Sequence, residues 1–163
     1  MSEDSGATGL RRFAQPVLLG GLIAGTVDIG AACLINGRGP TIILQAIASG
    51  VLGKASFRLG LQAAALGLVL QWAMSVLIAA IYVVGTSRLQ VVRRNWIGSG
   101  IAFGVVVFFV MNFVVVPLSA AGFSSKFSAS KLIENMLAMI LFGLIIAFFG
   151  RDSAARASGE LKR

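Results

Sequence analysis

The stretch GTVDIG, residues 25–30, places the carboxylate of Asp28 inside the apolar run PVLLGGLIAGTVDIGAACLI. A carboxylate in the middle of a bilayer costs about 2.5–3.5 kcal/mol on insertion scales, so it should face other helices and find a partner there. Such a group can do two kinds of chemistry. It can be a hydrogen-bonded contact that holds helices together, or it can exchange a proton or a cation during transport.

Gln71 and Ser75, one helical turn apart, offer Asp28 hydrogen-bond donors at a matching depth. At a rise of about 1.5 Å per residue, Asp28 lies roughly 18 Å along an outward-running first span, and Gln71 roughly 15 Å along an inward-running second span. Both therefore fall near the midplane, where the Gln71 amide suits a carboxylate. Asn112, in the third span, is a weaker candidate neighbour.

Lys54 and Arg58 offer Asp28 a different kind of partner on the outer side. If the segment between the first two spans dips inward, one of them would form a desolvated ion pair with the carboxylate. Without that pair, Asp28 would be protonated and would act as a structural contact.

The sequence offers no recognisable catalytic, cofactor or metal site. His is absent and Cys33 is the one cysteine, so a histidine- or thiolate-based metal site has too few ligands. A nucleophile with a base, or paired carboxylates, does not occur at a recognisable spacing. GVLGKAS at 50–56 lacks the strand context and the glycine spacing of a phosphate-binding loop. We therefore expect neither enzymatic activity nor a cofactor.

The elements that position these side chains are membrane helices. Hydrophobic residues make up 57% of the 163-residue chain and charged residues 12%, far from the composition of a soluble domain. A helix needs roughly 20 apolar residues to cross a bilayer. Four windows qualify: 17–36, 61–85, 97–118 and 132–150.

These windows predict an all-α, polytopic membrane protein with a single four-helix domain over residues 17–150. The ends, 1–16 and 151–163, contain too little apolar surface to pack and are expected to be mobile.

The apolar stretch TIILQAIASGVL at 41–52 is too short to cross, at about 18 Å as a helix. It predicts an interfacial or re-entrant helix that begins at Pro40. Gln45 and Ser49 lie one turn apart on it. We expect them to form a solvated stripe, with the bundle interior as the alternative.

Small residues indicate where the helices pack. Gly21, Gly25 and Asp28 share one face of the first span, and Gly100 and Gly104 repeat a small-xxx-small pair in the third. That second pair could also support dimerisation. The second span carries a small and polar stripe of Ala64, Gly67, Gln71, Ser75, Ala79 and Tyr82. The fourth span, with little beyond Ala138 and Gly143, does not complete the pattern.

Charge predicts the orientation of the spans. The formal charge of +8 does not indicate nucleic acid, because the basic residues form no single stripe with interleaved aromatic residues. We expect both termini in the cytoplasm, with Tyr82 and Trp96 as aromatic anchors near that interface. The side of the termini carries nine basic residues: Arg11, Arg12, Arg88, Arg93, Arg94, Arg151, Arg156, Lys162 and Arg163. The other side carries five: Arg38, Lys54, Arg58, Lys126 and Lys131.

A cleaved signal peptide is the alternative for the first span, because Arg11 and Arg12 precede an apolar run that ends in GAAC. Asp28 interrupts that run, and Gly30 stands where a large aliphatic residue is expected before the cysteine. We therefore expect the first span to be retained.

Four short motifs follow one another along the first three spans: GLIAG at 21–25, the span with Gln71, Ser75 and Tyr82, WIG from Trp96, and VPLSAAG closing the third span. Together they resemble the YagU-like group of small bacterial inner-membrane proteins. This resemblance implies a polytopic bacterial inner-membrane protein with cytoplasmic termini, and it implies no agreed biochemical activity. The chain departs from the group at Gln71, where members carry a histidine, and at Asp28, which has no matching acid.

Two functions follow from these features. We favour a non-enzymatic structural or accessory component of the membrane. The alternative is a small oligomeric transporter, or a proton or cation channel, that uses Asp28. The expected partners are the lipid bilayer and either a second copy of the chain or another membrane protein, and nucleic acid is not among them.

Overall fold

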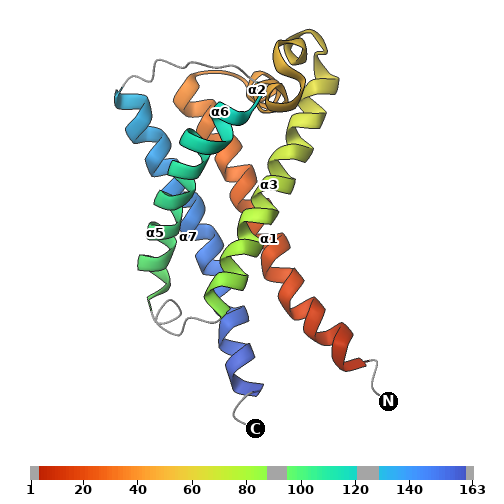
Figure 1. Ribbon diagram of the computed structural model, residues 1–163, viewed down its shortest axis with the longest axis vertical. Helices are drawn as coiled ribbons and strands as arrows, with labels where there is room; N and C mark the ends of the chain where they lie inside the picture. Colours follow the sequence, from red (N-terminus) through yellow and green to blue (C-terminus); the bar gives the residue numbers. More distant parts are fainter. Residues whose placement is uncertain (1–3, 88–94, 121–128, 161–163) are drawn as a thin grey trace.

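The computed structural model describes residues 4–87, 95–120 and 129–160, and every element in those ranges is helical (Figure 1). Four helical segments are long and apolar enough to cross a membrane: Ala14–Asn36, Leu61–Thr86, Trp96–Leu118 and Ala129–Arg151. A shorter helix lies between the first two of them. The predicted all-α architecture of four membrane spans and one short helix is therefore confirmed.

In chain order, the elements are α1 (Asp4–Asn36), α2 (Pro40–Leu52), the 3-10 helix η1 (Gly53–Arg58), α3 (Leu61–Ser87), α5 (Trp96–Val110), the π-helix η2 (Met111–Val115), α6 (Val116–Leu118) and α7 (Ala129–Glu160). The third span consists of α5, η2 and α6. The segments 88–94 and 121–128, which carry Arg88, Arg93, Arg94 and Lys126, lie outside the described residues.

Glycine ends α1 and lets the chain turn into α2. Gly37 has a φ of 59°, which side chains with a Cβ rarely adopt. The Gly37 and Arg38 amides donate to the Leu34 and Cys33 carbonyls, the paired bonds of a Schellman cap. Pro40 then occupies the first turn of α2, where its missing amide proton leaves no bond unmade. The chain therefore reverses direction within a few residues.

Two helix boundaries differ from those expected. α1 begins at Asp4 and α7 ends at Glu160, so helix extends into both segments that were predicted to be mobile. Adding residues to an existing helix needs no new nucleus, which explains why these polar ends continue it. The expectation for residues 1–3 and 161–163 falls outside the described residues.

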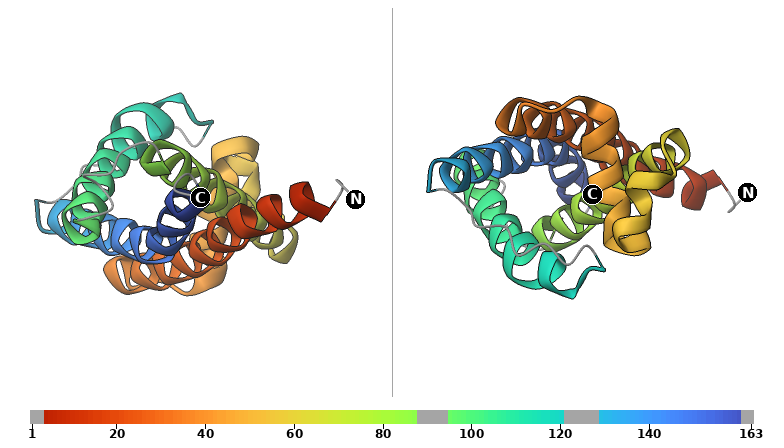
Figure 2. Two further views of the ribbon diagram at one scale, coloured as in Figure 1. Left: turned by 90° about the horizontal axis from the view of Figure 1, so that it is seen from below. Right: turned by 90° about the horizontal axis from the view of Figure 1, so that it is seen from above.

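The four spans form a bundle in which α7 lies between α5 and α1, as the views along the long axis show (Figure 2). α1 also packs against α3, and α3 contacts α7. Both termini lie at the same end of the bundle (Figure 1), as an even number of spans requires. α2 crosses the opposite end, roughly perpendicular to the spans (Figure 2).

Small residues are among the most buried in this bundle, beside large ones such as Ile146 and Phe142, and many other large apolar side chains lie on its outside. Ala24, Ala79 and Ala147 are at most 1% exposed, whereas Leu61 and Leu118 are about 80% exposed. Soluble bundles bury their largest apolar residues, but a helix in lipid gains nothing by hiding leucine from hydrocarbon. This distribution fits a protein that is surrounded by lipid.

Glycine also brings α5 and α7 into close contact. A methyl group at Gly143 would overlap the backbone of Gly100 and Gly104, and one at Gly104 would overlap the Met139 carbonyl. Of the two small residues noted in the fourth span, Gly143 is the one that α5 meets. Gly100 and Gly104 are also occupied within the chain, so that pair is not a free face for dimerisation.

The helix α2 is tied to the bundle at two places. The Gln45 Nε2 amide donates to the Gly60 carbonyl at 2.9 Å, and the Ala120 amide donates to the Gly50 carbonyl at 2.9 Å. Gln45 is 8% exposed and Ser49 is 1% exposed, so the solvated stripe expected for them is wrong. Gln45 faces inward to bind the start of α3, and the buried Ser49 hydroxyl donates to the Ala46 carbonyl of its own helix at 2.6 Å. The position of α2 across the bundle favours the interfacial interpretation over the re-entrant one.

We expect Gly143→Ala to lower the free energy of unfolding by about 1–3 kcal/mol, because α5 must move away from α7 to admit the methyl group. Gly85→Ala is the matched control, since nothing lies within 4 Å of a Cβ at that position on α3. Unfolding in mixed detergent micelles, followed by far-UV circular dichroism, measures the difference. Equal stability of the two variants would contradict the close contact.

Candidate functional site

The structure brings Asp28 and Gln71 together across the contact between α1 and α3. The Gln71 Nε2 amide donates a hydrogen bond to Asp28 Oδ2 at 2.8 Å. Both side chains are partly buried. Asp28 lies eight residues before the end of α1, or about 12 Å by the helical rise, which is within the candidate span. The carboxylate therefore has a donor from the neighbouring helix.

Close backbone packing holds the two helices at this distance. An added Cβ at Gly25 would lie 2.5 Å from Ser75 Oγ, and one at Gly21 would lie 2.7 Å from the Val76 Cα. Ser75 is 1% exposed, and its hydroxyl donates to the carbonyl of Gln71 on its own helix at 2.8 Å. Ser75 thus packs beside the bond between Asp28 and Gln71 and does not itself donate to Asp28.

A second polar contact between α1 and α3 was not expected from the sequence. The indole Nε1 of Trp72 donates to Thr26 Oγ1 at 3.2 Å, and the Thr26 hydroxyl donates to the Leu22 carbonyl at 2.8 Å. The Trp72 side chain is 37% exposed. Its ring edge nevertheless reaches back to α1, a geometry that helical periodicity does not predict.

Asn112, Lys54 and Arg58 lie away from this pair. The Asn112 amide donates to the Phe108 carbonyl of its own helix at 2.8 Å. Asn112 belongs to the π-helical turn η2, which precedes Pro117, a residue without an amide proton. Lys54 and Arg58 are exposed in η1, and the hydrogen bond that the structure shows for Asp28 comes from Gln71.

Tyr82 also differs from its expected role as an interfacial anchor. It is 6% exposed, and its hydroxyl shares a 2.6 Å hydrogen bond with Ser99 Oγ on α5. Its ring lies 4.8 Å from that of Phe103. Tyr82 therefore links α3 to α5 near the end of the bundle that carries the termini.

The arrangement around Asp28 defines what it can do chemically. One carboxylate with one amide donor can hold a proton or a hydrogen bond, and it offers too few ligands for a stable metal site. Within the described part of the chain, no three His, Cys, Asp or Glu side chains come together. The cluster of functional interest is thus the pair Asp28 and Gln71, with Ser75 packed beside it.

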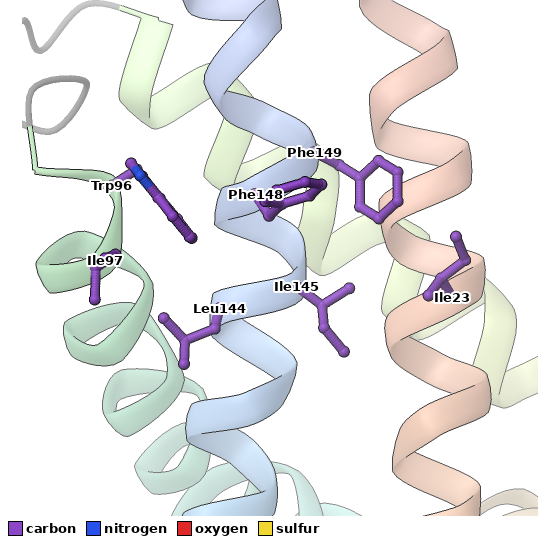
Figure 3. Close-up of a pocket in the computed structure, with 7 residues that line it drawn as sticks. All are labelled: Ile23, Trp96, Ile97, Leu144, Ile145, Phe148 and Phe149. Atoms are coloured by element: carbon purple, nitrogen blue, oxygen red, sulfur yellow. The ribbon is translucent and has the colours of Figure 1, made fainter.

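A cavity of about 390 Å³ lies along α7, and Asp28 is not among the residues that line it (Figure 3). Its floor is α7, from Leu144 to Phe149, and its walls are Ile23 of α1 with Trp96 and Ile97 of α5. We call it the α7 groove. Every lining side chain is aliphatic or aromatic, so the groove is no route for water to Asp28.

These features define the class of the protein as a polytopic membrane protein with four candidate spans and a polar contact within the bundle. Comparison with known proteins adds no closer identification. No family model matches the chain, and neither a curated protein nor a solved structure matches it.

We expect Gln71→Leu to lower the free energy of unfolding by about 0.6–2 kcal/mol, because Asp28 loses its donor inside the bundle. Gln62→Leu is the matched control, since Gln62 is an exposed glutamine near the start of the same helix. Its effect should stay within about 0.5 kcal/mol. Unfolding in mixed micelles measures both variants. If they are equally stable, the bond between Asp28 and Gln71 contributes nothing.

Proposed function

We propose that this chain is a non-enzymatic, multi-pass component of a bacterial inner membrane that acts as a structural or accessory subunit. The observation that carries the proposal is the 2.8 Å hydrogen bond from Gln71 to Asp28 within a closely packed helix contact. A carboxyl group with a donor from the facing helix needs no cation to stay in place. This is the arrangement that a structural role for Asp28 requires.

The outer surface supports an accessory role. Phe109 and Phe113 are 53% and 69% exposed, and their rings stack at 5.8 Å on the outside of the third span. Exposed aromatic and aliphatic side chains of this kind contact either lipid or another membrane helix. The proposed partner is therefore a second copy of the chain or a larger membrane protein.

One observation favours transport as the second candidate. Asp28 is only partly buried, and among the described residues the one hydrogen bond to its carboxylate involves Oδ2. The other oxygen, Oδ1, leaves room for a proton or a cation. An intramembrane carboxylate with such an oxygen is the kind of group that proton relays use. A transporter of this size would act as an oligomer.

The cellular setting is part of the proposal. By chain order, nine basic residues flank the ends of the spans on the side of the termini and five flank the other ends, which supports cytoplasmic termini by the positive-inside rule. The bacterial inner membrane rests on the resemblance to the YagU-like group, which we retain as a proposal for the motifs of the first three spans.

We expect Asp28→Asn to change the free energy of unfolding by less than about 1 kcal/mol, because asparagine keeps an oxygen that can accept from Gln71. We also expect no proton or cation flux into liposomes from either protein. Glu134→Gln is the matched control, since Glu134 is an exposed acid whose side chain is bonded to Ser130 at 3.0 Å. Proton flux is measured by a pH-sensitive dye enclosed in the liposomes and cation flux by a cation-sensitive dye. Thermal melts of the same preparations measure stability.

The outcomes separate the two candidates. Stable proteins without flux support the structural role and exclude transport by Asp28. Flux in the wild type and in Glu134→Gln that disappears in a folded Asp28→Asn would make the carboxylate the working site and overturn the structural role.

The orientation has its own test. Green fluorescent protein fused after Arg163 should fluoresce in cells if the C-terminus is cytoplasmic. Its chromophore forms in the cytoplasm but not after export through the general secretory route. Alkaline phosphatase fused at the same position should be inactive, because it needs an oxidising compartment for its disulfides. The reverse pair of results would place the termini outside.

A further inference from the structure

The α7 groove ends at an arginine that aromatic rings hold in place. The Arg151 guanidinium lies 4.0 Å from the ring centre of Phe148 and 5.5 Å from that of Trp96. The two rings also meet each other edge to face at 5.9 Å. Both Phe148 and Trp96 line the groove. The apolar channel and the cationic group are therefore parts of one continuous surface.

Arg151 stands where a bilayer would have its headgroups. It is the last residue of the candidate span Ala129–Arg151, and it is exposed. Guanidinium groups bind phosphate through paired hydrogen bonds, and stacking on aromatic rings orients the planar donors in advance. α5 begins at Trp96, so the positive end of its helix dipole lies beside the same position.

The walls of the groove leave it open toward the lipid. Ile23 is 41% exposed, Ile97 is 50% exposed and Phe148 is 44% exposed, although all three lie within the candidate spans. α3 lies behind α7 in the view of Figure 3, and neither Asp28 nor Gln71 lines the groove. A ligand would enter it sideways from the bilayer.

We propose that the α7 groove binds one anionic phospholipid, with an acyl chain along α7 and the phosphate at Arg151. The lipid comes from the leaflet at the end of the bundle that carries the termini. Charge complementarity selects this occupant: the cationic end of an otherwise apolar groove matches a molecule with an anionic head and an apolar tail. An apolar helix face of a second copy of the chain would leave that match unused. The proposal is independent of the role of Asp28.

Native mass spectrometry of the full chain, released from detergent, tests the proposal with two defined lipids of identical acyl chains. Phosphatidylglycerol should bind about fivefold more tightly than phosphatidylcholine, as one arginine at a membrane surface contributes. Arg151→Gln should remove that preference. Lys131→Gln is the matched control, because Lys131 is an exposed cation at the opposite end of α7, and it should keep the preference.

A second variant tests the groove without altering charge. Ile97→Trp should fill the space between α5 and α7 and weaken the binding of phosphatidylglycerol severalfold. Leu137→Trp is the control, since Leu137 is 58% exposed on α7 and does not line the groove.

Three results would overturn the proposal. They are equal retention of the two lipids by the wild type, an unchanged preference in Arg151→Gln, or dimers that Ile97→Trp abolishes while lipid binding persists. The wild-type comparison needs no variant, so the proposal stays testable even if a substitution prevents folding.

Discussion

Helix backbones in this bundle approach each other most closely at glycine, and the remaining contacts depend on that approach. Lipid tails are as apolar as leucine, so burying apolar side chains provides little force to bring helices together. Contact between surfaces that fit closely has to supply it. Gly143 lets α7 meet α5, Gly25 lets α1 meet α3, and Gly67 lets α3 meet the carbonyl of Leu44 in α2. The contacts of α5 with α7, of α1 with α3 and of α2 with α3 each have such a point.

The polar bonds follow from this spacing. Gln71 can reach Asp28 because Gly25, less than one turn away, allows Ser75 to approach the backbone of α1. At the opposite end of α3, Tyr82 reaches Ser99. Hydrogen bonds between helices in membranes are individually weak, at roughly 0.6–2 kcal/mol. Their role here is to fix which rotation of each helix is compatible with its neighbour, while the packing of small residues provides most of the attraction.

Sequence reasoning predicts the features that belong to one helix at a time. Length and hydropathy identify the spans, and periodicity identifies the face that carries Gly25 and Asp28. The helical rise then predicts that Gln71 lies at a matching depth. These properties are local, and pairing Asp28 with Gln71 adds only the assumption that consecutive spans are neighbours.

The features that sequence reasoning missed depend on which helices meet. Gly143 is one small residue in an apolar run until α5 packs against it. Gln45 and Ser49 would form a solvated stripe only if α2 did not contact the spans. In the structure α2 packs on the end of the bundle, and Gln45 binds the Gly60 carbonyl. Arg151 lies over Phe148 of its own helix, and a second ring comes from Trp96 on another helix. Periodicity predicts which face of a helix is buried, but it does not predict which other helix packs against that face.

The geometry of α1 keeps the two proposed sites separate. Ile23 and Asp28 are five residues apart, which corresponds to about 7.5 Å along the helix and about 140° around it. Ile23 therefore borders the groove beside α7 while Asp28 faces α3. A lipid in the groove does not contact the carboxylate. Coupling between the sites would require α1 to move as a rigid body. The close contact of Gly20 with Phe149 near the groove, and that of Gly25 with Ser75 near Asp28, resist such a movement.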